Sequence, residues 1–260
     1  MLLEKKNAVV YGGGGSVGSA VARAFAREGA TVFLAGRSGD TLERVAAEIS
    51  SEGGASHTAE VDVLDERAVD GHADRVASEA GGIDVSFNAT SHGDVHGMPL
   101  AEMPVEDVVG PLSSAMRAQF LIARAAARHM AARGSGVIMS ITATTARMTI
   151  PQVGGTGVTF DAIESMCRQW ACELGPLGVR VVWLQTTGLP EGLHAELFPD
   201  YGTGAPMTRK QLVAWMEQRT MLRRLTSLEE LGNAAAFLAS DLAGATTGCG
   251  MNLTCGSVPG

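Results

Sequence analysis

The sequence predicts a single α/β domain with a doubly wound sheet of seven parallel strands and helices on both faces. Short apolar runs alternate with segments whose apolar residues recur every three or four positions, which is the pattern of strands covered by helices. A glycine-rich turn joins the first run to the first helical segment. No repeat or change in composition divides residues 1–260, so we expect one domain.

Each element has its own signal in the sequence. In the first helical segment Val17, Val21 and Ala24 stand four and seven positions apart, which places them on one helical face. The long segment 186–221 lacks such a pattern, and a loop of this length usually forms a lid or a binding element. The predicted strands are 8–11, 31–35, 57–63, 83–88, 137–141, 179–184 and 250–254. The predicted helices include 17–25, 42–49, 69–80, 105–133, 163–174 and 228–238.

Composition excludes several classes of partner. Acidic residues number 28 and basic residues 20, and the net charge of −8 argues against a nucleic-acid or anionic-membrane partner. No apolar stretch approaches the 20 residues of a membrane span, and the first residues lack the apolar core of a signal peptide. The four cysteines do not have the spacing of a metal site or a disulfide framework. We therefore expect a cytoplasmic protein.

The turn YGGGGSVG, residues 11–18, predicts a nucleotide site. Glycines at this place let the backbone approach a pyrophosphate, which then rests on the positive end of the helix. The strand–turn–helix context favours this interpretation over a flexible turn without a ligand. The residues expected to contact the cofactor here are Gly12, Gly14, Ser16, Val17 and Gly18.

Arg37 follows the second predicted strand, where a doubly wound, Rossmann-type sheet faces the adenosine ribose. An acidic residue at this place would accept a hydrogen bond from the 2′-hydroxyl of NAD. The guanidinium of Arg37 suits a 2′-phosphate instead, so NADP(H) is favoured over NAD(H). The alternative is an ordinary surface arginine.

These motifs resemble those of the short-chain dehydrogenase/reductase family along almost the whole chain. Gly12 and Gly18 match the family's glycine-rich turn, with Ser16 in place of its middle glycine. VDV at 61–63 matches the segment that places an aspartate near the adenine, and FNAT at 87–90 matches the family's Asn-Asn-Ala-Gly. The resemblance implies a nicotinamide cofactor, a small-molecule substrate and a homo-oligomer, either dimer or tetramer. It adds Asp62, Val63, Asn88 and Ala89 to the expected cofactor site.

The same resemblance predicts an atypical active site. The family uses a tyrosine, a lysine four residues later, a serine and an asparagine, and by register these positions hold other residues here. No tyrosine in the chain precedes a lysine by four residues, or by the seven typical of the related enoyl reductases. Ketone reduction by the family's usual mechanism is therefore not expected. The four positions hold Thr156, Phe160, Ala143 and Ala115.

The loop TSHGDVHGMP after the fourth strand offers a replacement acid or base. His92 is the first candidate, because the pKa of histidine lies near working pH. A His-x-Asp-x-His metal site with Asp94 and His96 is an alternative but lacks an evident further ligand. A solvated polar loop without a catalytic role is the other alternative.

Threonine hydroxyls near the expected site could hydrogen-bond a substrate carbonyl. The candidates are Thr142, Thr144 and Thr156, although free hydroxyls are too basic to act as acids without activation. We expect Asp161 and Glu164 to lie at the start of the fifth helix, where their negative charges only complement the helix dipole.

Three functions fit these residues. The first is an NADP(H)-dependent oxidoreductase that reduces an activated C=C bond of a small hydrophobic or aromatic carbonyl compound. The second is a non-redox enzyme such as an isomerase, cyclase or dehydratase, and the third is a catalytically silent homologue. Retention of the nucleotide-binding motifs places the oxidoreductase first.

Overall fold

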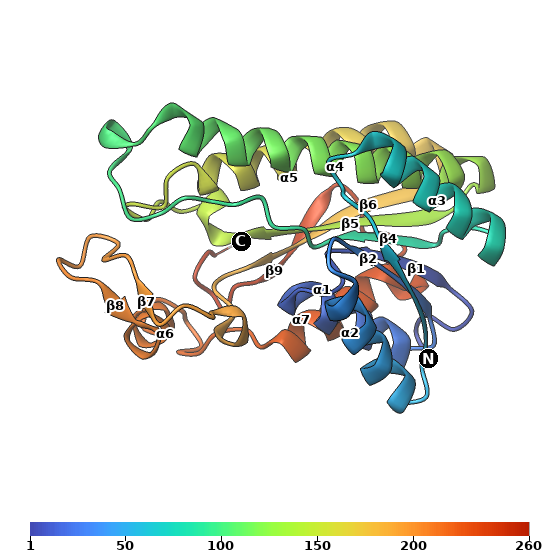
Figure 1. Ribbon diagram of the computed structural model, residues 1–260, viewed down its shortest axis with the longest axis horizontal. Coiled ribbons are helices and arrows are strands. Elements are labelled where there is room, and N and C mark those ends of the chain that lie inside the picture. The colour runs from blue at the N-terminus through green and yellow to red at the C-terminus, as the bar shows by residue number, and fades with distance from the viewer. Residues whose placement is uncertain (260) are drawn as a thin grey trace.

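The computed structural model describes residues 1–259, which form a seven-stranded sheet in the order β3-β2-β1-β4-β5-β6-β9 (Figure 1). Every neighbouring pair in this sheet is parallel, as predicted. The strands are β1 (Asn7–Tyr11), β2 (Thr31–Gly36), β3 (Ala55–Glu60), β4 (Val85–Asn88), β5 (Gly136–Ala143), β6 (Val179–Thr186) and β9 (Cys249–Leu253).

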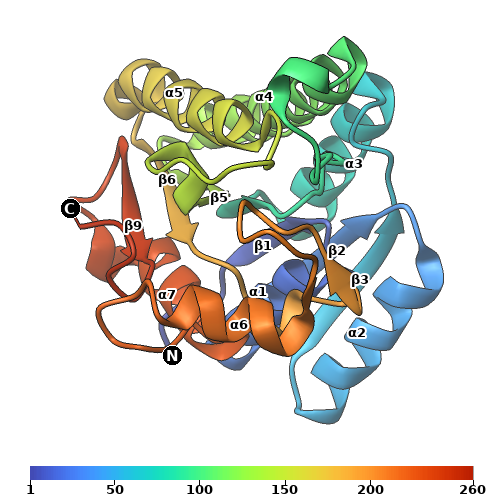
Figure 2. The same cartoon turned by 90° about the vertical axis from the view of Figure 1, so that its left-hand side faces the viewer.

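Helices cover both faces of the sheet, which makes three layers (Figures 1 and 2). One face carries α1 (Ser16–Arg27), α2 (Gly39–Ser51) and α7 (Leu228–Ala239). The other carries α3 (Glu66–Ala80), α4 (Val105–Arg133) and α5 (Thr156–Leu174).

Strand β1 shows why the apolar runs are continuous. Ala8 and Val10 pack into the core beside α1, α2 and α7, whereas Val9 and Tyr11 pack into the core beside α3, α4 and α5. Successive side chains of a strand point to opposite faces, so a strand covered on both sides needs apolar residues at every position.

Strand order fixes where a ligand can bind. The chain winds from β1 outward to β2 and β3, then crosses back to β4 on the other side of β1. The connections that follow β1 and β4 therefore run in opposite directions, and a crevice is left at the carboxyl ends of these two strands.

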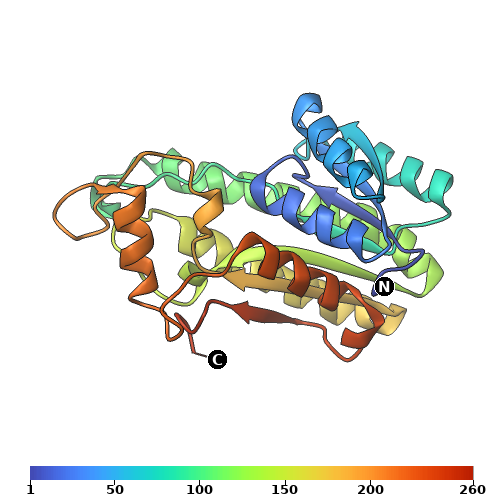
Figure 3. The same cartoon turned by 90° about the horizontal axis from the view of Figure 1, so that it is seen from below.

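The segment 186–221 is more regular than predicted. It contains the two-stranded antiparallel pair β7 (Leu197–Phe198) and β8 (Met207–Thr208), followed by α6 (Arg209–Glu217). Thr208 accepts a hydrogen bond from the backbone N–H of Gln211, whose side chain returns to Thr208, and this capping box starts α6. Figure 3 shows these elements beyond the carboxyl ends of the strands.

The end of the third strand differs from the prediction, and the difference shapes the site. The third strand ends at Glu60, before the predicted 57–63 run is complete, and this releases residues 61–63 to line the crevice. Within residues 1–259 no helix has the length and apolarity needed to cross a membrane.

Candidate functional site

A crevice of about 630 Å³ lies at the carboxyl ends of β1, β2 and β4, beside α4. It brings together residues that are far apart in the chain, as expected at the point where strand order reverses. Of the predicted cofactor residues, the lining includes Gly12, Gly14, Arg37, Asp62, Val63 and Ala89. It also includes Ser38, Thr41, Thr90 and Ser114, polar residues that the motifs did not single out.

The glycine-rich turn is shaped by close backbone contacts. A Cβ on Gly12 would lie 2.6 Å from the carbonyl oxygen of Ala89, and one on Gly18 would lie 2.1 Å from that of Gly12. Gly12 also has a φ of 79°, which a side chain disfavours. Glycine at these two positions therefore lets β1, β4 and α1 approach one another.

Helix α1 begins at Ser16 and has no side-chain cap. The backbone N–H groups of its first turn, which includes Val17 and Gly18, can therefore serve an anion at the positive end of the helix. Ser16 Oγ lies 3.0 Å from His194 Nε2, and this contact ties the 186–221 segment to the glycine-rich turn. Sequence reasoning did not anticipate a role for His194.

Arg37 lines the crevice directly after the end of β2. It is exposed and makes no ion pair with any of the described residues. Its guanidinium is therefore available to an anionic ligand. Asp62, which also lines the crevice, accepts a hydrogen bond from the backbone N–H of Leu64 at 3.0 Å.

The side chain of Asn88 stabilises the wall of the crevice through hydrogen bonds to the protein interior. Its amide donates to Gln119 Oε1 at 2.9 Å, and its oxygen accepts from the backbone N–H of Thr90 at 3.0 Å. Gln119 in turn donates to Ser140 Oγ at 2.7 Å. The side chain of Asn88 thus joins β4 to α4, and Gln119 joins α4 to β5, while Ala89 lines the crevice.

His92 lines the crevice but does not meet any of the candidate threonines. Its Nε2 lies 3.5 Å from Asp94 Oδ2, and its ring packs edge-on against Phe160, with 5.4 Å between ring centroids. Among residues 1–259 no group of three or more histidine, cysteine, aspartate or glutamate side chains is placed to hold a metal ion.

His96, rather than His92, contacts one of the candidate threonines. Its Nε2 lies 2.8 Å from Thr156 Oγ1, at the first residue of α5, and its Nδ1 lies 3.3 Å from the hydroxyl of Tyr201. Desolvation of the ring lowers the pKa of His96, and the negative charge of Asp94 opposes this. Only the alternation of His92, Asp94 and His96 in the sequence pointed to this loop, and it could not choose between the two histidines.

The expectation that Glu164 only complements a helix dipole is wrong. Helix α5 begins at Thr156, so Glu164 lies in its third turn, where the side chain is wholly buried and paired with Arg147. Thr142 donates to its Oε1 at 3.1 Å, as does Gln185. The hydroxyl of Thr142 therefore serves this buried carboxylate.

The remaining threonines differ in what surrounds them. Thr144 is buried in the turn after β5, where its carbonyl accepts from the backbone N–H of Arg147 at 2.8 Å. Thr156 is 6% exposed and donates to the carbonyl of Val153 at 2.7 Å. Of the candidate threonines, Thr156 is the one in contact with a histidine.

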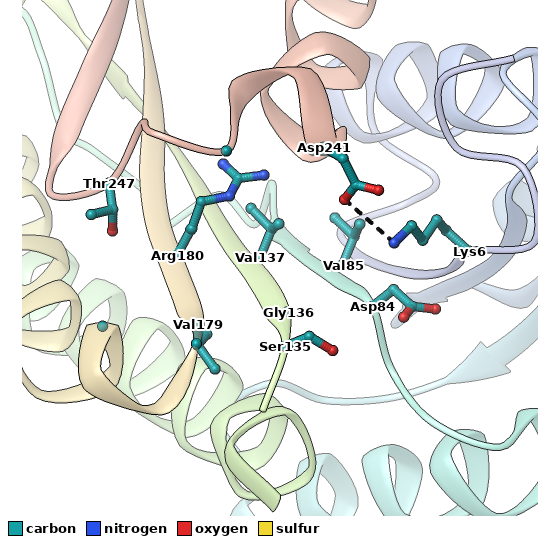
Figure 4. A pocket seen from close by; sticks show the side chains of 14 residues that line it. Lys6, Asp84, Val85, Ser135, Gly136, Val137, Val179, Arg180, Asp241 and Thr247 are labelled. Atoms are coloured by element: carbon teal, nitrogen blue, oxygen red, sulfur yellow. Dashed lines mark ion pairs between the residues drawn. The ribbon is translucent and has the colours of Figure 1, made fainter. Parts of the chain in front are cut away.

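A second cavity, of about 360 Å³, lies at the opposite edge of the sheet (Figure 4). It is formed by the amino ends of β4, β5 and β6, and Lys6 Nζ pairs there with Asp241 Oδ1 at 3.5 Å. Arg180 donates to the backbone carbonyl of Ser240 at 3.0 Å. Because these charged groups have partners within the protein, the carboxyl-edge crevice is the candidate site.

Comparison with known proteins agrees with this geometry. Residues 13–257 match the family model described as enoyl-(acyl carrier protein) reductase. Gluconate 5-dehydrogenase of Gluconobacter oxydans (strain 621H) is 30% identical over 238 residues, which cover 92% of this chain and 89% of the relative.

Two solved structures illustrate the likeness in fold. A short-chain type dehydrogenase/reductase from Mycobacterium marinum is 28% identical with a TM-score of 0.84, over 99% of this chain and 97% of that one. A gluconate 5-dehydrogenase from Burkholderia cenocepacia J2315, in complex with NADP and tartrate, is 24% identical with a TM-score of 0.85, over 97% and 95% of the two chains.

The fold and the crevice define a doubly wound protein whose site lies at the carboxyl edge of its sheet. The chain belongs to the short-chain dehydrogenase/reductase family of oxidoreductases.

Proposed function

We propose that this protein is a nicotinamide-dependent oxidoreductase that binds NADP(H) in the carboxyl-edge crevice and NAD(H) more weakly. The observation that carries the proposal is Arg37, whose guanidinium lines the crevice without an ion pair among the described residues. A guanidinium binds a phosphate through charge-assisted, often bidentate hydrogen bonds, so Arg37 suits the 2′-phosphate of NADP(H). The B. cenocepacia relative, solved with NADP, supports a cofactor of this class.

The residues present fit such a cofactor. Gly14 and the first turn of α1 (Ser16, Val17, Gly18) would hold the pyrophosphate on free backbone N–H groups. The N–H of Gly12 already donates to the carbonyl of Ala35, so Gly12 would contribute by letting the backbone approach the pyrophosphate closely. Asp62 and Val63 would flank the adenine, and Ala89, braced by Asn88, would form the wall toward the nicotinamide. When bound, the cofactor supplies or accepts a hydride.

The reaction that this site supports best is reduction of an activated C=C bond. Ala143 at the end of β5 has no hydroxyl, and Thr156 at the start of α5 is a weak acid. An enolate tolerates slow protonation better than an alkoxide does, so a conjugated carbonyl compound suits the site better than a plain ketone. The description of the matching family model, an enoyl reductase, supports this class of reaction.

The 186–221 segment is proposed as the substrate lid. It lies beyond the carboxyl ends of the strands and presents Trp215, Tyr201 and the buried Met207. These side chains favour a small hydrophobic or aromatic substrate. Residence in the cytoplasm and assembly as a dimer or tetramer stay predictions.

The test is calorimetric titration of cofactor-free protein with NADPH and, separately, with NADH. NADPH oxidation is then followed with enones, quinones and ketones. We expect tighter binding of NADPH and turnover of the activated compounds. Absence of binding by either cofactor would contradict the proposal and leave the non-redox enzyme or the silent homologue.

A further inference from the structure

We propose that Tyr201, His96 and Thr156 form a proton relay that delivers the substrate's proton, with Thr156 as the residue that touches the substrate. The relay rests on the proposed oxidoreductase function. Its three members come from the 186–221 segment, the loop after β4 and the first turn of α5, so that tertiary structure alone assembles them. The two contacts are 3.3 Å from Tyr201 Oη to His96 Nδ1 and 2.8 Å from His96 Nε2 to Thr156 Oγ1.

The hydrogen bond that Thr156 donates determines the direction of the other two contacts in the relay. Thr156 Oγ1 donates its proton to the carbonyl of Val153 at 2.7 Å, so it can only accept from His96. Nε2 of His96 must then carry a proton, and in the neutral ring Nδ1 is left to accept from the Tyr201 hydroxyl. The three contacts thus define one tautomer and one direction of transfer, from Tyr201 toward Thr156.

The charges around His96 agree with a neutral ring. Thr156 faces it from α5 and Tyr201 faces it from the turn between β7 and β8, and neither is charged at neutral pH. Asp94 lies in the same loop, and its attraction is outweighed by desolvation, which lowers the pKa of His96. A neutral imidazole can accept a proton at one nitrogen while it releases one from the other.

Tyr201 is held in place against local strain. Its φ of 47° lies in the left-handed region, which a bulky side chain seldom adopts. Its ring stacks on the ring of Trp215 in α6, with 6.3 Å between the two centroids. The guanidinium carbon of Arg219 lies over the ring of Trp215, 3.8 Å from its centroid. Strain of this kind persists where the surrounding structure over-determines it, and it occurs often at functional sites.

The chemical step balances without another reagent. A bound dihydronicotinamide would supply a hydride to the substrate's β-carbon, which would leave an enolate. The hydroxyl of Thr156 turns from the carbonyl of Val153 to the enolate oxygen and gives up its proton, while the Nε2 proton of His96 replaces it. His96 Nδ1 takes the proton of Tyr201, and solvent water returns a proton to the phenolate. The enol then tautomerises to the saturated ketone, and the cofactor leaves oxidised. Because His96 replaces the proton of Thr156 as it leaves, the threonine hydroxyl can act as an acid, which an isolated threonine hydroxyl cannot do.

The first experiment needs neither cofactor nor substrate. NMR of the protein labelled with ¹⁵N in its histidine rings should show His96 neutral at pH 7 with the proton on Nε2. Thr156→Val and Tyr201→Phe should each shift the ring signals of His96. They should leave unchanged those of His129, which lies on α4 and pairs with Asp74 of α3. A proton on Nδ1, or no response to either variant, would overturn the relay.

The second experiment compares two electron acceptors with NADPH as donor. Reduction of 2-cyclohexenone needs a proton at the enolate oxygen, whereas 1,4-benzoquinone gives a stable hydroquinone anion that does not. His96→Gln should lower kcat for the enone by about a hundredfold, the usual contribution of a general acid. It should leave quinone turnover and NADPH affinity within about twofold, because general damage to the site would lower both reactions. Added imidazole should restore part of the enone activity of His96→Ala.

The outcomes separate the relay from the proposed function. If the wild type binds NADPH and turns over the enone, but His96→Gln keeps its rate and pH profile, the relay alone is wrong. If the wild type turns over the quinone and not the enone, the relay is also wrong. If the wild type reduces neither compound, the proposed function fails and the relay fails with it. His129→Gln, which removes a half-buried histidine paired with Asp74 on α3, should match the wild type in both reactions.

Discussion

Glu164 and Arg147 form an ion pair in which the carboxylate is wholly buried while the guanidinium side chain stays 42% exposed. Arg147 comes from the turn after β5 and reaches over the side of α5. The pair therefore ties that turn to the helix that begins with Thr156. Thr142 and Gln185 complete the carboxylate's hydrogen bonds from β5 and β6.

We expect Arg147→Met to lower the free energy of unfolding by about 3 kcal/mol, because it leaves a buried carboxylate without its main partner. Arg168, whose Nη1 lies 3.8 Å from Glu164 Oε2, can offset part of the loss. Urea unfolding of Arg147→Met should be compared with the double variant Arg147→Met/Glu164→Leu. The double variant should recover most of the stability, and a further loss there would contradict this account.

The close approach at Gly18 predicts opposite effects for two glycine substitutions. Gly18→Ala places a Cβ against the backbone oxygen of Gly12 and should destabilise the fold by about 1–3 kcal/mol, as overpacking does. Gly71→Ala, in the middle of α3 with open space around it, should stabilise the fold by about 0.5–1 kcal/mol. Thermal unfolding of both variants measures the contrast. Equal changes in stability for the two variants would mean that the glycine-rich turn can move to accommodate a Cβ at position 18.

Acid should destabilise the protein through His72. Burial lowers the pKa of His72 from 6.5 to about 4, and its Nδ1 lies 3.3 Å from the hydroxyl of Tyr11. Between these pH values the unfolded chain binds a proton that the folded protein does not bind, so stability falls as the pH drops from 6.5 toward 4. The full loss is about 3 kcal/mol, at 1.36 kcal/mol for each pKa unit.

Urea unfolding at pH 7 and pH 4.5 measures the contribution of His72. In His72→Gln the difference in stability between the two pH values should shrink by about 2–3 kcal/mol relative to wild type. The matched variant His57→Gln removes an exposed histidine of β3 that forms no ion pair with the described residues, and it should keep the wild-type difference. An unchanged difference in His72→Gln would assign the acid sensitivity to other groups.

Arg37 should set cofactor preference. Arg37→Ala should weaken NADPH binding about tenfold or more, since a hydrogen bond to a charged group is worth at least about 1.5 kcal/mol. Its effect on NADH should be within about twofold, because NADH lacks the 2′-phosphate. Calorimetric titration measures both constants. Arg44→Gln, on α2 outside the crevice, is the matched control, and equal losses for both cofactors would exclude recognition of the 2′-phosphate.

The sequence by itself determined the layered fold, because its signals are local or periodic. The apolar residues Ala8, Val9 and Val10 predicted a strand covered on both faces, and both faces of β1 are buried. The predicted helix at 105–133 matches α4, which follows Pro104 and ends before Gly134 with a φ of 71°. Such boundaries depend on neighbouring residues and are therefore visible in a single chain.

Tertiary structure alone decided which side chains meet at the site. His92 and His96 have the same spacing to Asp94, and only packing turns His96 toward Thr156 and His92 toward Phe160. Tyr201 reaches His96 across 105 residues of chain. The burial of Glu164 likewise depends on partners in the turn after β5 and in β6. Contacts of this kind arise when separate elements dock, so no local periodicity encodes them.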